Sequence, residues 1–243
     1  MNTPTAVPLA VSNGAPIHWL PDRDTHLLIA GAAGSGKTAL LEWVASTVAG
    51  RGWGVWILPD AGHPSDELTV PQAKIRAADA DASLTVLGDA HALMMQRLEL
   101  LARGGAYPAD FDPVLVVVDA WTTIVAAASL RRGCAGDLSP AEVARGRLVR
   151  IVRLARPTNV HLAVATQRPG GAPIASEIGN FAARIGIGRL SSPAAALMWG
   201  EAHIGHALGG AAVGPATLMT SAGIVTGAHA LSASVARVRD VTR

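Results

Sequence analysis

The amino-acid sequence predicts an α/β domain with a mostly parallel sheet flanked by helices. Its apolar strand segments are continuous rather than alternating, which indicates burial on both faces of a sheet. Segments with leucine and valine at helical spacing alternate with these strands, an order typical of doubly wound α/β domains. Proline, glycine and capping residues separate the two kinds of segment. The strand segments are residues 27–30, 55–58, 114–118 and 160–165.

The first half of the chain alternates strand and helix in a regular way. The strand at 27–30 runs into a glycine-rich loop, and residues 39–48 then carry leucine and valine at helical spacing. The second strand, 55–58, ends at a proline, and a polar connecting segment follows over residues 60–83. Helical spacing returns at 93–101. Strand, loop, helix and strand therefore follow one another in the order of a parallel crossover unit.

A third helix is marked by its capping residues. Ser139 supplies a hydroxyl N-cap, Pro140 takes the first helical position, and Glu142 completes a capping box. We expect this helix to run to Arg156, because Pro157 stops it.

The last part of the chain changes to shorter apolar pieces. After the strand at 160–165, residues 216–220 and 223–235 read as short strands, which we assign to the far edge of the same sheet. No internal repeat or linker divides the sequence. We therefore expect a single domain over residues 1–243, with residues 1–24 as a lead-in segment.

Composition excludes several classes of protein. With 50% hydrophobic and 16% charged residues in 243, the chain is too apolar to stay disordered. A single cysteine, Cys134, rules out an internal disulfide framework and favours a reducing, cytoplasmic compartment. The net charge of +2 neither requires nor excludes a nucleic-acid partner. The uncharged stretch between Glu201 and Arg237 contains six glycines and Pro215, so we expect no transmembrane segment.

The loop after the first strand has the spacing of a phosphate-binding P-loop. Glycine, four variable residues, glycine, lysine and threonine stand at Gly31, Ala32, Ala33, Gly34, Ser35, Gly36, Lys37 and Thr38. Glycines let backbone N–H groups curl around phosphate, and the following helix N-terminus adds partial positive charge. Lys37 would neutralise the β and γ phosphates, and the Thr38 hydroxyl would bind Mg²⁺. A glycine-rich turn without nucleotide is the alternative, and the flanking strand and helix disfavour it.

Asp119 stands where P-loop NTPases place the acid that holds the metal, at the end of the strand 114–118. An aspartate in this position is also an ordinary N-cap for the next helix. The P-loop upstream favours the metal role, so the sequence predicts ATP and Mg²⁺ as ligands, with Thr38 and Asp119 at the metal.

With these motifs in place, the sequence resembles the motor domain of FtsK/SpoIIIE-type DNA translocases, including actinobacterial TraB-like plasmid-transfer proteins. The matching segments follow the family order at 7–9, 14–19, 26–38, 116–119, 161–169, 180, 183–185 and 191–192. The Ala-Thr-Gln-Arg-Pro segment at 165–169, downstream of a P-loop, is the most specific of the remaining matches. The resemblance implies a RecA-like fold, double-stranded DNA as cargo and a hexameric ring with ATP at its subunit interfaces.

The resemblance also implies further site residues. Gln167 matches the family's sensor amide at a strand end, although it also reads as a plain loop amide. Arg184 matches a family arginine, and either it or the nearby Arg189 would act as an arginine finger in a neighbouring subunit. Surface arginines are common in this chain, which leaves a structural role open. The implied catalytic residues are Lys37, Asp119, Gln167 and Arg184.

One departure from the family pattern bears on hydrolysis. Where the family has a water-activating glutamate after the metal aspartate, this sequence has Ala120. Losing a general base typically costs about 10²- to 10⁴-fold in rate. Nucleotide binding should survive, whereas hydrolysis depends on a substitute acid such as Asp112 or Glu142, which the sequence does not place at the site.

Arginines crowd the helix that Ser139 caps. Arg150, Arg153 and Arg156 fall on one face and could contact phosphate, but arginines near a helix C-terminus also complement its dipole. The sequence favours a solvated face.

The resemblance implies two alternative functions. The first is an ATP-driven motor that translocates double-stranded DNA in conjugal transfer or in chromosome or plasmid segregation, with a membrane-anchored partner in reach of a cytoplasmic ring. The second is a hydrolysis-impaired ATP-binding assembly module, similar to the degenerate motor domains of type VII secretion ATPases. Ala120 is the residue that separates them.

Overall fold

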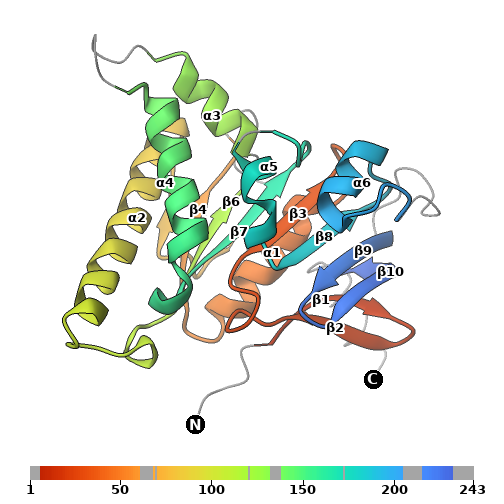
Figure 1. Cartoon of the computed structure of the whole chain (residues 1–243), viewed down its shortest axis with the longest axis horizontal. Coiled ribbons are helices and arrows are strands. Elements are labelled where there is room, and N and C mark those ends of the chain that lie inside the picture. Colours follow the sequence, from red (N-terminus) through yellow and green to blue (C-terminus); the bar gives the residue numbers. More distant parts are fainter. Residues whose placement is uncertain are drawn as a thin grey trace.

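A ten-stranded sheet forms the centre of the molecule in the computed structural model, which describes residues 6–60, 68, 70–119, 121–131, 138–171, 173–204 and 215–231 (Figure 1). The strand order is β2-β1-β10-β9-β8-β3-β7-β6-β4-β5. The strands are β1 (Val7–Ser12), β2 (Ala15–Trp19), β3 (Leu27–Gly31), β4 (Gly54–Leu58), β5 (Ile75–Arg76), β6 (Val114–Val118), β7 (Val160–Thr166), β8 (Ala183–Ile187), β9 (Pro215–Thr220) and β10 (Gly223–Ala230).

The sheet divides into a parallel and an antiparallel part. From β8 through β3, β7, β6 and β4 to β5, neighbouring strands run parallel. From β8 through β9, β10 and β1 to β2, each pair is antiparallel. The predicted α/β fold with a mostly parallel sheet and extra strands at its C-terminal edge is therefore confirmed. β1 and β2 were not predicted as strands, and they extend this edge as a hairpin within the expected lead-in segment.

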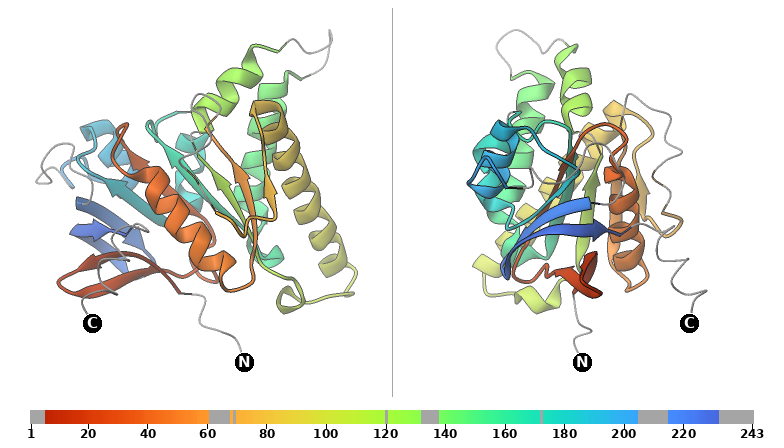
Figure 2. Two further views of the ribbon diagram at one scale, coloured as in Figure 1. Left: turned by 180° about the vertical axis from the view of Figure 1, so that it is seen from behind. Right: turned by 90° about the vertical axis from the view of Figure 1, so that its right-hand side faces the viewer.

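Helices cover both faces of the parallel part (Figures 1 and 2). Leu27 and Ile29 of β3 pack in the cluster that contains α1, while Leu28 and Ala30 pack in the opposite cluster with the remaining longer helices. This alternation confirms that the strands are buried on both faces. The helices are α1 (Lys37–Ala49), α2 (Ala80–Ala102), α3 (Trp121–Ser129), α4 (Pro140–Leu154), α5 (Ile174–Glu177) and α6 (Ser192–Trp199).

The capping signals place α4 correctly. The Ser139 hydroxyl accepts from the Glu142 backbone N–H, and the Glu142 side chain accepts from the Ser139 backbone N–H at 2.8 Å, which is the predicted capping box. The helix ends at Leu154, two residues before the predicted Arg156, and a short 3₁₀ turn over Arg156–Thr158 follows.

The segment predicted as a connection over residues 60–83 contains regular structure. Ile75 and Arg76 form β5, and α2 begins at Ala80, where the Asp79 side chain caps it by accepting from the Ala82 N–H at 2.8 Å. At the C-terminal edge, β10 ends at Ala230, and residues 232–235 of the strand predicted over 223–235 lie outside the described part of the chain.

Candidate nucleotide-binding site

The loop between β3 and α1 has a backbone that requires glycine. A Cβ atom at Gly31 would lie 2.5 Å from the Ser35 Oγ and 2.8 Å from the Ile187 carbonyl oxygen, closer than van der Waals contact allows. Gly36, the N-cap of α1, has φ 100°, a left-handed conformation that L-residues rarely adopt. The glycines of the predicted P-loop therefore let the chain turn tightly from strand into helix. This turn exposes the N-terminal N–H groups of α1.

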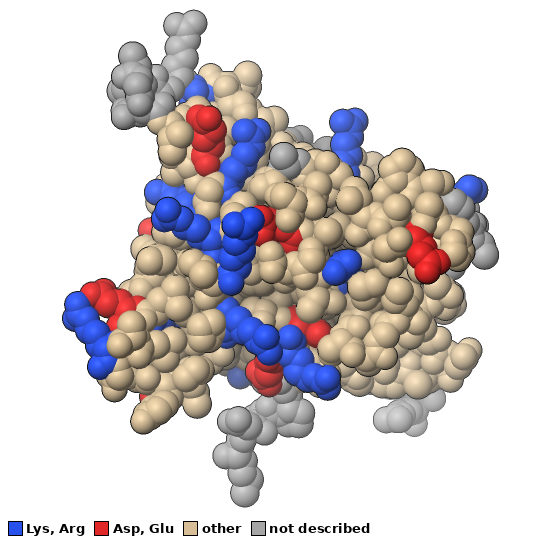
Figure 3. All heavy atoms as spheres, viewed as in Figure 1, with Lys and Arg blue, Asp and Glu red and all other residues tan. Residues whose placement is uncertain are grey.

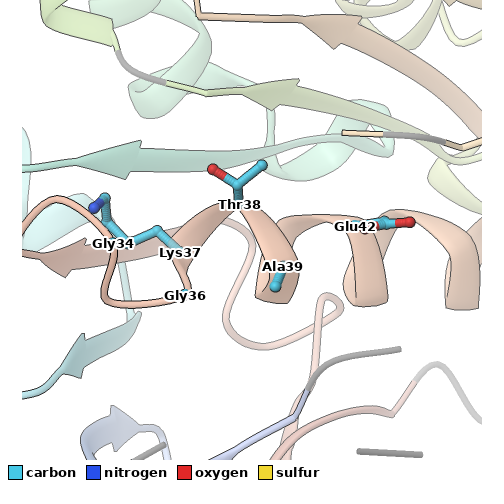
Figure 4. Close-up of a pocket in the computed structure, with 6 residues that line it drawn as sticks. All are labelled: Gly34, Gly36, Lys37, Thr38, Ala39 and Glu42. Carbon is cyan, nitrogen blue, oxygen red and sulfur yellow. The ribbon is translucent and has the colours of Figure 1, made fainter. Parts of the chain in front are cut away.

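An open cavity of about 310 Å³ lies against this turn and the first two turns of α1 (Figure 4). Its lining residues are Gly34, Gly36, Lys37, Thr38, Ala39 and Glu42. Inside the loop, the Lys37 Nζ donates to the Ala32 carbonyl oxygen at 2.7 Å. The lysine thus folds back over the loop, where anionic oxygens would compete with this neutral carbonyl for the ammonium group.

Thr38 and Asp119 meet although 81 residues separate them in the sequence. The Thr38 Oγ1 donates to the Asp119 Oδ2 at 2.9 Å. Asp119 is the first residue after β6, and β7 lies between β6 and the strand that carries the loop. Because these strands are parallel, their carboxyl ends share one edge of the sheet, as in ligand sites of other α/β proteins. The structure therefore brings the two predicted metal ligands together.

The electrostatics of this edge suit a metal-bound polyphosphate. Burial lowers the pKa of Lys37, and the negative charge of Asp119 opposes this effect. The buried Ser35 Oγ has no hydrogen-bond partner in the described part of the chain. A helix N-terminus, a lysine and a hydroxyl-carboxylate pair are the groups that bind phosphate and Mg²⁺ in P-loops. The donor set therefore fits ATP with Mg²⁺.

Gln167 lies between the two halves of this site. It is exposed and directly follows β7, whose last residue, Thr166, is in register with Ala30. The predicted sensor thus occupies the same sheet edge as the P-loop and Asp119. Its role stays a prediction.

Arg184 is held away from this edge. It lies in β8 opposite Leu28, three residues before the register of Gly31. Its Nε donates to the Phe181 carbonyl oxygen at 2.7 Å and its Nη1 to the Met198 carbonyl oxygen at 2.9 Å. These contacts give it a structural role at the end of α6, and it would have to leave both acceptors to act as an arginine finger.

Arg189, unlike Arg184, lies at the sheet edge that carries the P-loop. It is exposed in the loop after β8, and Ile187 at the end of that strand pairs with Gly31 of the P-loop strand. Of the two arginines that the sequence offered for a neighbour's site, Arg189 is therefore the one at the carboxyl edge.

The acids considered as substitutes for the missing glutamate are placed differently. Asp112 precedes β6, so the length of that strand, about 17 Å, separates it from the edge that carries Asp119. The Glu142 carboxylate is bound by the Ser139 backbone and hydroxyl at 2.8 and 2.7 Å, and these hydrogen bonds lower its pKa. Ala120 itself lies outside the described residues.

Ala39 and Glu42 line the cavity but were not among the predicted site residues, and Glu42 is the one with a polar side chain. It follows Thr38 by four residues on α1, and this spacing puts the two side chains on one helix face. The helical spacing after the P-loop was the signal that could have identified it.

No protein-family model matches the sequence, and no curated protein matches it. Among solved structures, the chain is similar to the pCW3 conjugation coupling protein TcpA in a form with ATPgS, with TM-score 0.79 and 17% identity over 100% of this chain and 72% of that one.

Two type VII secretion ATPases are also similar in structure. They are the cytoplasmic domain of Thermomonospora curvata EccC (TM-score 0.71, 18% identity, 94% of this chain and 28% of that one) and ATPases 2 and 3 of Geobacillus thermodenitrificans EssC (TM-score 0.70, 14% identity, 95% and 41%). The chain therefore spans less than half of either secretion ATPase structure. These likenesses show that the chain shares the fold of the coupling protein and of these secretion ATPases, in agreement with the RecA-like fold that the resemblance to FtsK/SpoIIIE-type motor domains implies.

Proposed function

We propose that this chain is an ATP-binding motor domain of FtsK/SpoIIIE type that translocates double-stranded DNA. The observation that carries the proposal is the convergence of Lys37, Thr38 and Asp119 at one sheet edge, with the Thr38 Oγ1 2.9 Å from the Asp119 Oδ2. ATP with Mg²⁺ would supply the phosphoryl group and the chemical energy. We further propose that residues 1–243 form one motor domain, because the lead-in hairpin pairs with β10 in the same sheet.

The residues of the chain divide the work at this edge. The N–H groups after Gly36 and the Lys37 ammonium group would bind the phosphate oxygens. These oxygens would then replace the Ala32 carbonyl oxygen as the acceptor for the lysine. Thr38 and Asp119 would hold the metal ion, directly or through water. Gln167, exposed at the end of β7, would contact the γ-phosphate side of the site and report its state to the loop that follows.

The proposed assembly is a hexameric ring in the cytoplasm that works on double-stranded DNA next to a membrane-anchored partner. The likeness to a conjugation coupling protein supports the DNA cargo and the transfer role. Arg189, exposed at the P-loop edge, supports a site shared between subunits. No helix in the described part of the chain combines the length and apolarity needed to cross a membrane.

A DNA-stimulated ATPase assay at several protein concentrations tests the proposal, because a ring motor needs both DNA and self-association. We expect turnover to rise with added duplex DNA and more steeply than in proportion to protein concentration. Sedimentation with and without an ATP analogue should show nucleotide- or DNA-dependent assembly. A strict monomer under every condition, including DNA and ATP analogue together, would contradict the motor.

Ala120 favours a second candidate, a module that binds ATP for assembly and hydrolyses it poorly. Asp112 lies beyond the far end of β6 and Glu142 is occupied by its capping box, so neither is positioned as a replacement base. If the module is correct, turnover stays very slow, and Ala120→Glu should raise it by about 10²-fold or more in the assembled protein. Brisk DNA-dependent turnover by the natural protein would refute the impaired site, whereas no hydrolysis by either form would refute the motor.

A further inference from the structure

A row of arginines crosses the solvent side of α4 and continues into the turn that follows it. Arg147, Arg150, Arg153 and Arg156, here called the arginine face, recur at every third residue. At 1.5 Å per residue each step advances about 4.5 Å along the axis and turns by about 300°, so the row slants across the helix from α2 towards α5. Figure 3 shows lysine and arginine side chains gathered in a band over this region.

Two of these side chains contact neighbouring elements. Arg153 donates from its Nε and Nη2 to the two carboxylate oxygens of the buried Glu177, at 2.8 and 2.5 Å, and Asn180 supports the same carboxylate at 2.9 Å. Arg147 crosses α2 at Gly88, where a Cβ atom would lie 2.9 Å from its Nη1. Glycine inside a helix costs stability, so its presence here makes room for a guanidinium group.

Most of the arginines of the face have no acidic partner among the described residues. In the described part of the chain, Arg150 and Arg156 are exposed and form no ion pair with a carboxylate, and only Arg153 of the four has an acidic partner. The neighbouring His91 of α2 is affected by these positive charges. Burial lowers its pKa most, and the charges of Arg150 and Arg147 lower it further. Its Nε2 is buried without a partner among the described residues. A polyanion laid along α4 would relieve this repulsion.

We propose that the arginine face binds the phosphate backbone of double-stranded DNA. Arginine presents a planar fork that pairs with phosphate oxygens, and a regular row of such groups matches a regularly charged polymer better than an isolated acidic side chain. The inference rests on the proposed function for its cargo, and it assigns that cargo to a surface outside the nucleotide site.

Fluorescence anisotropy with a short labelled DNA duplex over a series of salt concentrations tests the assignment in the full chain. The variant is R150A/R156A, because both side chains are exposed and unpaired in the described structure. The matched control is R103A/R131A, which removes two exposed arginines that already pair with the acidic side chains of Glu99 and Asp81. ATP-analogue binding by calorimetry is measured for each protein to show that the fold and the P-loop are intact.

Each lost phosphate contact removes about 0.9 from the slope of log affinity against log salt, so R150A/R156A should flatten the slope by about 1.8. R103A/R131A should keep the slope of the natural protein. Equal slopes for the natural protein and R150A/R156A would overturn the assignment while leaving the DNA motor intact. Loss of binding to polyglutamate but not to DNA in R150A/R156A would also overturn it, in favour of an acidic protein partner. If the natural protein binds nucleotide but no DNA at low salt, the proposed cargo and this inference both fail.

Discussion

Acidification should destabilise this protein through two histidines buried at the end of the sheet opposite the P-loop. His26 precedes β3, and its Nδ1 accepts the Leu162 N–H at 3.0 Å. His161 lies in β7, with its Nδ1 2.9 Å from the Thr25 carbonyl oxygen, to which it must donate. The His161 ring packs 5.0 Å from Trp53 and 6.1 Å from Trp19, measured between ring centroids. Water cannot reach either imidazole to stabilise a positive charge.

Burial lowers the pKa of His26 from 6.5 to about 3 and that of His161 to about 4. The unfolded chain, with ordinary histidine pKa values, therefore binds more protons than the folded chain as the pH falls below 6.5. Stability is complete above this value and is lost as the pH drops. At pH 5 the loss is about 2 kcal/mol per histidine and about 4 kcal/mol for both. Because both folded values lie below 5, this figure depends little on their exact magnitude.

Urea unfolding at pH 7 and pH 5 measures the effect, and the free energy of unfolding should fall by about 4 kcal/mol between them. In H26N/H161N the asparagine side chains can accept from Leu162 and donate to Thr25 but do not titrate, so most of the pH dependence should disappear. The exposed His203 gives a control, H203N, that should retain it. A change of less than about 1 kcal/mol in the natural protein would show that the unfolded histidines gain no protonation advantage and would refute the reasoning.

Two further substitutions test the P-loop. Lys37→Ala should abolish ATP binding in calorimetry, because it removes the cation that faces the phosphates, and unchanged affinity would contradict the site assignment. Gly31→Ala should lower the free energy of unfolding by about 1–3 kcal/mol, because the new methyl group meets the Ile187 carbonyl oxygen at 2.8 Å. Thermal unfolding measures this loss, and an unchanged melting temperature would show that the backbone moves aside freely.

The sequence predicted those elements whose signal is local. β3, β4 and β6 contain unbroken apolar runs, and the start of α4 is fixed by Ser139, Pro140 and Glu142 within a few residues. β8 was harder to recognise as a strand, because Arg184 and Gly186 interrupt its apolar run. The hairpin of β1 and β2 gains its stability from pairing with β10, more than 200 residues later, which no local pattern reports.

In the candidate site, too, residues with a local sequence signal could be predicted and those that depend on distant contacts could not. The P-loop was readable because its eight residues are contiguous and their spacing follows from phosphate geometry. The contacts of Arg184 could not be predicted from the sequence, because its acceptors are the backbone carbonyl oxygens of Phe181 and Met198. Met198 comes close only because α6 packs near β8. A guanidinium group carries the same sequence signal whether it binds a neighbour's phosphate or its own backbone.

Strand order connects the nucleotide site with the arginine face. β7 lies between the P-loop strand and β6, so Asp119 is brought to Thr38 from the far side of a neighbouring strand. Beyond Asp119 the chain forms α3, whose buried Trp121 and Ile124 share a hydrophobic cluster with Leu148 of α4. Packed residues of α3 therefore form a route from Asp119, the predicted metal ligand, to the helix that carries Arg147 and Arg150. If that route carries free energy, linkage requires nucleotide to change DNA affinity by the same factor by which DNA changes nucleotide affinity.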